Sequence, residues 1–287
     1  MSEAVNRVMV VGYGSMGRGI ALSFGRAGFA TTVLSRDPAA IGDLPDGVSA
    51  TAALPEAPPD LVIEAVPERM DLKQALLARL EAAYGAGPIL ASNTSSLPLQ
   101  EMADALAAPE RLIGVHYMHP AEALPMVEVI RVAQTTDEVL ARTTAALERT
   151  GKDSIVLAKP VIGFLINRLQ HAILHEAYCL IDDGIVKPED VDNFAKRMFG
   201  PRLCVTGLIE QKDLSGLDVH AAAQRGIVPH LHHTNRPSRV VQDLVEDGQY
   251  GAKTGTGFYD WREADLAAHR RKAADKLARL LALLEAD

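Results

Sequence analysis

Short apolar runs alternate with longer amphipathic stretches through the first half of the chain. Such runs, bounded by glycine, proline or polar residues, are typical of buried strands in a parallel sheet. They lie at 8–11, 31–34, 61–66, 88–91, 112–116, 126–132 and 154–158. Patterns of helical spacing fall after the first run and at 71–84, 99–106 and 136–150. The alternation predicts an α/β fold, with one small element in the link between 38 and 59.

The pattern changes after Lys159 and Pro160. From there on, apolar residues recur at helical spacing and the strand-like runs stop. Helices are predicted at 161–183, 188–199, 214–225, 239–246 and 264–284. A chain of 287 residues exceeds one ordinary domain. We therefore expect an α/β domain over residues 1–159 and an all-helical domain over residues 160–287, the latter serving the substrate and dimerisation.

A glycine motif follows the first predicted strand and opens a helix. Gly12, Gly14 and Gly17 have the spacing G-x-G-x-x-G. The first glycine permits a tight turn, the second lets a pyrophosphate approach the backbone, and the third lets helix and strand pack closely. The helix N-terminus adds free N–H groups. The motif predicts a Rossmann-type dinucleotide-binding domain, with Ser15 and Met16 among its cofactor contacts.

The end of the second predicted strand bears on the choice between NAD and NADP. NAD sites usually carry an acid there for the ribose 2′-hydroxyl, whereas NADP sites bring an arginine to the 2′-phosphate. Ser35 occupies the acid's place, Arg36 follows it, and Asp37 comes two residues late. These residues favour NADP over NAD, although Arg36 as a solvated surface charge stays an alternative.

Composition narrows the class of protein. The formal net charge of −8 argues against a nucleic-acid partner, which would need a basic face. Two cysteines cannot build a disulfide framework. No apolar run reaches the roughly 18 residues that a membrane span needs, and the first strand begins too early for a signal peptide. We expect a soluble, cytoplasmic protein with neither a nucleic-acid nor a membrane partner.

Candidate acid–base chemistry lies where predicted strands end. His116 closes one strand, and Glu128 lies on the next strand-like segment. A carboxylate on one imidazole nitrogen would orient the ring and leave the other nitrogen for substrate. The polar loop 92–96 also follows a strand, at the edge where open α/β sheets bind ligands, and we expect Asn93 to contact the cofactor. By spacing alone, an unrelated histidine and glutamate remain the commoner case.

Other histidines are grouped along the helical half. His171 and His175 are one turn apart on a predicted helix, and His171 is one turn from Asn167. A second group contains His230, His232 and His233. The first group lacks an evident third ligand, and the second has no neighbouring acid or cysteine in the sequence. We therefore predict no metal site.

Several longer motifs resemble the short-chain L-3-hydroxyacyl-CoA dehydrogenase family, whose relatives include L-gulonate 3-dehydrogenase (lambda-crystallin) and L-carnitine dehydrogenase. The resemblance covers nearly the whole chain. It is carried by GYGSMGRGIA, IEAVPERMDLK, SNTSSLPL, GVHYMHPAEALPMVEVI, GFLINRL, DLSGLD and GAKTGTGFYDW. It implies hydride transfer between a 3-hydroxy and a 3-oxo acyl compound, with His116 and Glu128 as the catalytic dyad. It also implies oxygen-binding roles for Ser95 and Asn167 and cofactor contacts from Glu68 and Lys73. The large apolar faces of residues 160–287 separately predict a homodimer through this part of the chain.

The sequence also departs from the family pattern. Only the short stretch 36–60 stands where the family usually carries a long helical hairpin that helps to hold coenzyme A. His119 replaces the asparagine of the family's H-x-x-N-P motif. These departures leave a small free hydroxy acid or an imine open as substrate. A non-catalytic, crystallin-like dinucleotide-binding protein is the alternative from another class, and the set His116, Glu128, Ser95 and Asn167 favours the enzyme.

Overall fold

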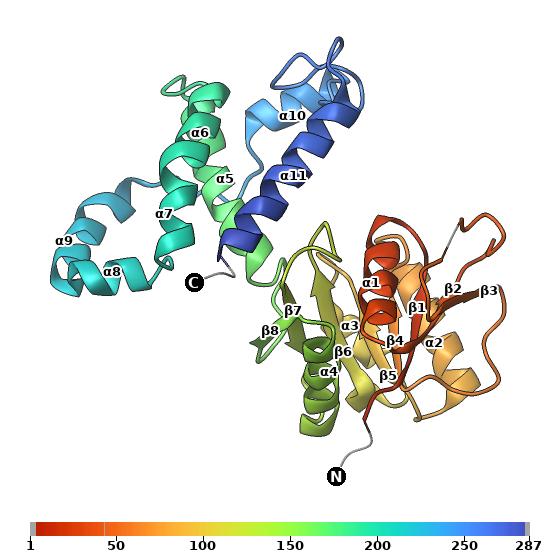
Figure 1. The fold of residues 1–287 in the computed structure, drawn as a ribbon. Coiled ribbons are helices and arrows are strands. Elements are labelled where there is room, and N and C mark those ends of the chain that lie inside the picture. Colours follow the sequence, from red (N-terminus) through yellow and green to blue (C-terminus); the bar gives the residue numbers. More distant parts are fainter. Residues whose placement is uncertain (1–3, 43, 285–287) are drawn as a thin grey trace. The chain divides into compact units, whose positions relative to one another are not determined.

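The computed structural model describes residues 4–42 and 44–284, and its chain divides into two compact units (Figure 1). The first unit is Met1–Arg168 and the second is Leu169–Asp287. The first contains every strand of the sheet, and the second is helical. In the described ranges, no helix is both long enough and apolar enough to cross a bilayer.

The first unit is built on an eight-stranded sheet with the order β3-β2-β1-β4-β5-β6-β7-β8. Strands β1 to β6 are parallel, β7 runs antiparallel to β6, and β8 is parallel to β7. The strands are β1 (Arg7–Val11), β2 (Ala30–Leu34), β3 (Val48–Thr51), β4 (Leu61–Glu64), β5 (Ile89–Ser92), β6 (Leu112–Tyr117), β7 (Met126–Arg131) and β8 (Asp153–Leu157). The α/β fold predicted from the apolar runs is confirmed, and β3 is the small element expected between residues 38 and 59.

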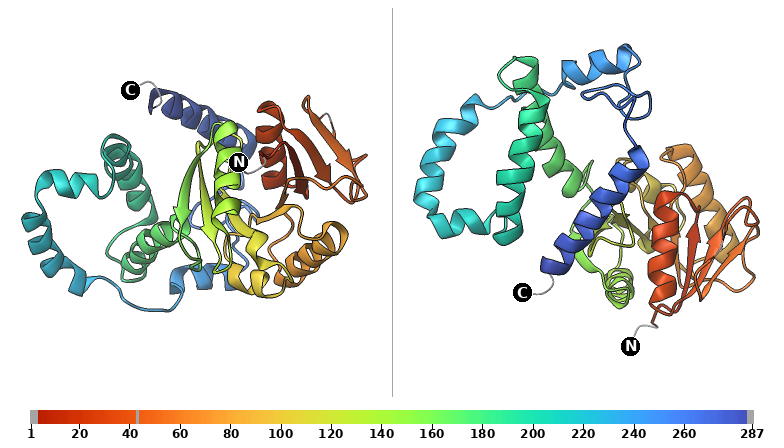
Figure 2. Two further views of the ribbon diagram at one scale, coloured as in Figure 1. Left: turned by 90° about the horizontal axis from the view of Figure 1, so that it is seen from below. Right: turned by 45° about the horizontal axis from the view of Figure 1, so that its top comes forward.

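Helices cover both faces of this sheet, which is why its central strands are apolar on both sides (Figure 2). Helices α1 (Ser15–Arg26) and α4 (Asp137–Arg149) pack on one face, through residues such as Phe24 and Leu147. Helices α2 (Met70–Tyr84) and α3 (Leu99–Asp104) pack on the other, through residues such as Leu80 and Met102. A one-turn 3₁₀ helix, η1 (Pro109–Arg111), leads into β6.

The chain reverses its direction across the sheet at β1. It runs outward through β2 and β3 and then returns to β4 on the other side of β1. Gly12 lies at this point with a φ of +96°, and a Cβ there would be 2.9 Å from the Ala65 carbonyl oxygen. A Cβ at Gly17 would be 2.1 Å from the Gly12 carbonyl oxygen. The close approach of the backbone therefore requires glycine at both positions, where the chain turns from β1 into α1 beside the end of β4.

The segment before helix α5 differs from the prediction of a helix from residue 161. Helix α5 spans Ile166–Asp182. Gly163 has a φ of +79° and Phe164 a φ of +47°, which is the left-handed region rather than the right-handed helix. The Phe164 side chain is 2% exposed and belongs to the apolar core beneath α2 and α3. Burial of this ring offsets the strain of a left-handed phenylalanine.

The second unit is a set of helices that follow α5 along the chain. They are α6 (Pro188–Phe194), a π-helical turn η2 (Ala195–Phe199), α7 (Gly200–Val205), α8 (Glu210–Ser215), α9 (Leu217–Ile227), a 3₁₀ turn η3 (Val228–His230), α10 (Arg239–Glu246) and α11 (Leu266–Leu284). The prediction of one helix over 214–225 is wrong, because Gly216, with a φ of +96°, separates α8 from α9. Within the described residues, helices α6 to α11 contain no fully buried side chain.

Candidate active site

A buried histidine–glutamate pair lies where β6 ends. His116 and Glu128 are register partners in the antiparallel pair β6 and β7, so their side chains leave the same face of the sheet. The distance between His116 Nδ1 and Glu128 Oε2 is 2.7 Å, and each residue is 4% exposed. The Phe164 ring lies against the imidazole, with 5.4 Å between ring centroids. The structure therefore brings together the two residues that the sequence placed on neighbouring strands.

A pocket of about 380 Å³ opens beside His116, at the carboxyl ends of β4, β5 and β6. Asn167 Nδ2 lies 3.5 Å from the Ser95 carbonyl oxygen, so the start of α5 borders the loop after β5. The pocket collects residues that are far apart in the sequence. It is lined by Met16, Ala65, Val66, Glu68, Asn93, Ser95, His116, Tyr117, Met118, His119 and Asn167.

Glu68 holds the loop after β5 in place. Its Oε1 accepts hydrogen bonds from the Thr94 hydroxyl and from the amides and hydroxyls of Ser95 and Ser96. Burial alone would raise the pKa of the Glu68 carboxyl. The hydrogen bonds from Thr94 and the two serine amides, with the charge of Lys73, instead lower it to about 2.

Lys73, which the family resemblance assigns to the cofactor, is buried in an ion pair. Its side chain is 1% exposed, and its ammonium donates to both Glu64 carboxylate oxygens at 2.8 Å. It also lies 3.4 Å from Glu68 Oε2 and is not among the residues that line the pocket. Lys73 therefore acts on the pocket through Glu68, by placing a positive charge behind that carboxylate.

The glycine loop and the end of β2 lie at the same edge of the sheet. Gly14 precedes α1 with no side-chain cap, and a Cβ added there would meet nothing within 4 Å. Ser15 Oγ lies 3.1 Å from His119 Nδ1. The glycine loop is thus in contact with the histidine that replaces the asparagine of the family's H-x-x-N-P motif. Ser35 and Arg36 follow β2 outside the pocket. Asp37 accepts the Ala40 amide in a local turn.

Asn93 joins two neighbouring strand ends. Its side-chain oxygen accepts the Tyr117 amide at 2.9 Å, and its own amide donates to the Glu64 carbonyl oxygen. The residue lines the pocket as well. It therefore fixes the loop after β5 relative to the end of the strand that carries His116.

The histidines of the helical unit do not assemble a metal site. Among the described residues, no group of three histidine, cysteine or acidic side chains is placed to hold a metal ion. His232 nevertheless has two acidic partners, Asp183 and Glu176, each 3.1 Å from a ring nitrogen. These carboxylates raise the pKa of His232, that of Asp183 most strongly. Sequence reasoning missed these two acids; Glu176 lies on α5, and Asp183 follows the last residue of that helix.

His171 and the remaining members of the histidine cluster are placed differently. His171 is exposed on α5, in the second unit. His233 Nε2 lies 2.8 Å from the Val228 carbonyl oxygen, and His230 closes the 3₁₀ turn η3. His175 lies 3.4 Å from the Thr234 hydroxyl.

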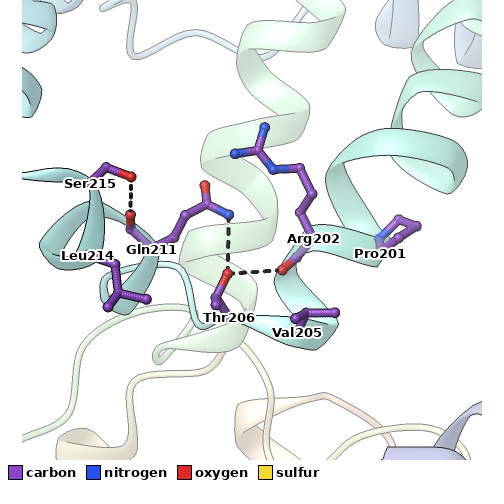
Figure 3. A pocket seen from close by; sticks show the side chains of 7 residues that line it. All are labelled: Pro201, Arg202, Val205, Thr206, Gln211, Leu214 and Ser215. Carbon is purple, nitrogen blue, oxygen red and sulfur yellow. Dashed lines mark hydrogen bonds between the residues drawn. The ribbon is translucent and has the colours of Figure 1, made fainter.

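A second hollow, of about 460 Å³, lies within the helical unit between α7 and α8 (Figure 3). Its lining is mainly apolar, with Arg202 as its charged side chain; the lining residues are Pro201, Arg202, Val205, Thr206, Gln211, Leu214 and Ser215. No acid, histidine or cysteine lines it, so it offers no acid–base pair like that of the first unit.

Comparison with known proteins agrees with this arrangement. Residues 46–160 match the model of the 3-hydroxyacyl-CoA dehydrogenase NAD binding domain, and residues 163–261 match that of its C-terminal domain. A probable 3-hydroxybutyryl-CoA dehydrogenase of Bacillus subtilis is 30% identical, over 90% of this chain and 98% of the relative. The 5-formyl-3-hydroxy-2-methylpyridine 4-carboxylate 5-dehydrogenase of Mesorhizobium japonicum is 27% identical, over 98% of this chain and 99% of the relative.

A solved structure extends the likeness to three dimensions. The crystal structure of a 5-formyl-3-hydroxy-2-methylpyridine 4-carboxylic acid 5-dehydrogenase, described as an NAD⁺-dependent dismutase, superposes with a TM-score of 0.92 at 26% identity. The superposition covers 98% of this chain and 99% of the other.

The Rossmann-type sheet and the matched NAD-binding domain define the class of protein as an NAD-dependent oxidoreductase. Within that class, the chain belongs to the 3-hydroxyacyl-CoA dehydrogenase family. The resemblance seen in the sequence motifs is thereby confirmed.

The lowered pKa of Glu68 predicts a pH-dependent contribution to stability. A carboxyl group whose pKa is lower in the folded than in the unfolded protein stabilises the fold. This contribution is complete at pH values above the unfolded pKa, 4.5, and is lost as the pH falls toward the folded pKa of about 2. We expect Glu68→Gln to lower the free energy of unfolding at pH 7 by about 1–2 kcal/mol, allowing for partial exposure. Urea unfolding at several pH values measures the difference between the two proteins.

The difference should shrink below pH 4.5, because protonated Glu68 resembles glutamine. A difference that stays constant down to pH 3 would contradict the assignment of that pKa to Glu68.

Proposed function

We propose that His116 is the general acid–base group of a dehydrogenase that interconverts a hydroxyl and a carbonyl, and that Glu128 is its partner. The observation that carries the proposal is the buried contact of 2.7 Å between His116 Nδ1 and Glu128 Oε2, beside the pocket. A carboxylate there stabilises the imidazolium that forms when Nε2 takes a proton. A crystallin-like binding protein would have no need of this pair.

The other predicted residues complete the proposed reaction. In oxidation, His116 Nε2 takes the proton of the substrate hydroxyl, and in reduction it returns that proton. The Ser95 hydroxyl, which lies 3.2 Å from Glu68 in this structure, turns to donate to the substrate oxygen. The Asn167 amide is the second donor and steadies the developing charge on that oxygen. A nicotinamide cofactor supplies hydride transfer when it is bound.

The role of His116 is tested by His116→Gln, which keeps a polar side chain but cannot exchange a proton near neutral pH. We expect turnover to fall about 10²- to 10⁴-fold in both directions. Cofactor affinity should barely change, because the glycine loop holds the cofactor. Steady-state kinetics and cofactor titration provide the two measurements. Near-normal turnover in both directions would reject His116 as the acid–base group.

The glycine loop fits a dinucleotide. Gly12 and Gly17 close the β1–α1 turn, and the space over Gly14, at the N-terminus of α1, lets phosphates approach the backbone. Ser15 and Met16 would contact the cofactor from this loop, and Glu68 and Asn93 would contact it from the pocket, which they line together with Met16. Lys73 supports this side through Glu68.

Of the two nicotinamide dinucleotides, we propose that the protein binds NADP more tightly than NAD. Ser35 removes the acid that would repel a 2′-phosphate, Arg36 adds an exposed cation after β2, and Asp37 is engaged in its own turn. A charge-assisted contact of this kind is worth about 1.5–3 kcal/mol, or roughly ten- to a hundredfold in affinity.

Arg36→Ala tests the preference. We expect the dissociation constant for NADP to rise roughly ten- to a hundredfold, while that for NAD stays nearly constant, because the 2′-phosphate is the partner that is lost. Fluorescence titration with both reduced cofactors measures this. Equal affinity of the unaltered protein for NAD and NADP would overturn the proposed preference.

For the substrate, we propose a small free hydroxy or oxo acid, in preference to a CoA thioester. Among the described residues between Arg36 and Asp60, which exclude residue 43, the secondary structure is the short strand β3, with no helical hairpin. The Mesorhizobium japonicum relative is named for a free pyridine carboxylate. Both observations favour a substrate without a nucleotide carrier.

A substrate panel tests this choice. Free 3-oxo acids should be reduced at least as efficiently as their CoA esters, because the described residues between β2 and β4 form no helical hairpin that could bind the nucleotide. The measurement is kcat/KM by cofactor oxidation, with coenzyme A alone as a competition control. Activity confined to CoA thioesters would exclude the free acid as the preferred substrate.

We propose that residues 160–287 serve substrate binding and form a homodimer. The helical unit exposes large apolar side chains at high fractions, including Val205 at 83%, Ile209 at 76% and Leu214 at 73%. A folded monomer rarely leaves large apolar patches exposed, and side chains of this kind recur along the helices of the unit. A second copy supplies the same apolar surface around a two-fold axis.

Light scattering at micromolar protein should give the mass of a dimer. Ile209→Glu should shift the mass toward the monomer, because a charge would be buried without a partner. As a control, Glu246→Gln on α10 should leave the mass unchanged. A monomer mass for the unaltered protein would contradict the proposal.

A further inference from the structure

Glu128 uses its two carboxylate oxygens for two different partners. Oε2 faces His116 Nδ1 at 2.7 Å. Oε1 accepts the backbone amides of Leu165 at 2.8 Å and Ile166 at 2.9 Å. Because Glu128 is 4% exposed, water cannot readily replace these donors. All four residues belong to the first unit.

The two backbone amides decide the orientation of Glu128. An amide N–H can only donate, so the oxygen that faces Leu165 and Ile166 must be an acceptor. An ionised carboxylate is an acceptor at both oxygens, so the hydrogen bond to His116 needs its proton on Nδ1. In neutral His116, the Nε2 atom is then the unprotonated one.

We infer that the Leu165 and Ile166 amides lock Glu128 in the orientation that keeps the His116 proton on Nδ1, and so make the backbone that enters α5 a positioning element of the site. The tautomer follows from the contacts alone, whereas its value for catalysis rests on the proposed function of His116.

The backbone around Leu165 and Ile166 is fixed by contacts of its own. Phe164 is left-handed and buried, its ring lies against His116, and its amide donates to the Val161 carbonyl oxygen at 3.0 Å. The Arg168 amide donates back to the Gly163 carbonyl oxygen at 3.2 Å. Asn167 follows Ile166 directly, so Glu128 also sets the position of Asn167 relative to His116.

The lock predicts an unusual consequence for Glu128→Gln. A glutamine has one acceptor oxygen and one NH₂ group. Its oxygen must face the two backbone amides, since an NH₂ group there would oppose two donors. The NH₂ group then faces His116 Nδ1, which must accept, and the histidine proton moves to Nε2. Nε2 can no longer take the substrate proton.

Nitrogen-15 NMR of histidine-labelled, full-length protein at alkaline pH tests the tautomer, with the His116 signals assigned by their loss in His116→Gln. We expect protonated Nδ1 in the unaltered protein and protonated Nε2 in Glu128→Gln. Turnover of Glu128→Gln should fall as far as that of His116→Gln, about 10²- to 10⁴-fold. The affinity of Glu128→Gln for a carbonyl substrate should fall by a smaller factor than its turnover, because protonated Nε2 can donate a hydrogen bond to the carbonyl oxygen.

The outcomes separate the lock from the proposed function. A His116 proton that stays on Nδ1 in Glu128→Gln would overturn the lock, because the glutamine would then have turned around. A moved proton without loss of turnover would support the lock and reject His116 as the acid–base group.

Ile166 provides a second test that leaves Glu128 in place. Ile166 is the first residue of α5, where proline is well tolerated, and Ile166→Pro removes one of the two donors. Ile166→Ala keeps the donor and removes the side chain. We expect Ile166→Pro to lower kcat about tenfold more than Ile166→Ala, with KM nearly equal in the two variants. Equal kcat in the two, with intact circular dichroism, would reject a positioning role for this amide.

Discussion

The antiparallel pairing of β6 and β7 is the constraint on which the candidate site depends. It places His116 directly opposite Glu128, so two residues that are distant along the chain share one face of one sheet. Side chains alternate between the two faces of a sheet, and a shift of one residue in register would send Glu128 to the opposite face. The pairing is protected by its apolar neighbours, because Val115, Val127 and Val129 are buried in one core. Packing therefore sets the register, and the register sets the distance between imidazole and carboxylate.

A second set of charges organises the edge of the sheet around this pair. Glu64, at the end of β4, and Lys73, on α2, form an ion pair that is almost wholly buried. Taking two charges out of water is costly, and breaking such a pair typically costs about 3–5 kcal/mol because one charge is left uncompensated. The Glu64 carboxylate also accepts hydrogen bonds from the Ser92 hydroxyl and the Val66 amide. The Lys73 ammonium lies 3.4 Å from the Glu68 carboxylate as well. The strand ends beside the pocket are thus joined through polar side chains, in addition to the backbone hydrogen bonds that pair the strands.

The two units differ in what stabilises them. The first unit buries two apolar cores, one on each face of its sheet, and needs no further partner to cover its central strands. The helices of the second unit leave large apolar side chains exposed. Polar contacts join its later segments to the end of α5, such as those of His232 with Glu176 and Asp183 and that of the Val240 amide with Asp182. Burial of apolar surface is the main source of stability in folded domains, and the exposed apolar side chains of the second unit are the reason for proposing a homodimer.

Local pattern determined much of this protein. The apolar runs predicted the strands, the glycine spacing predicted the turn between β1 and α1, and the longer motifs indicated the family. These features depend on residues close together in sequence, where spacing and backbone preference decide. The tertiary structure decided the left-handed turn at Phe164, the two acids around His232 and the amides at the second oxygen of Glu128. Those amides lie 37 and 38 residues from Glu128. Backbone donors are present at nearly every position, so no residue type marks the two that a carboxylate will meet once the chain has folded.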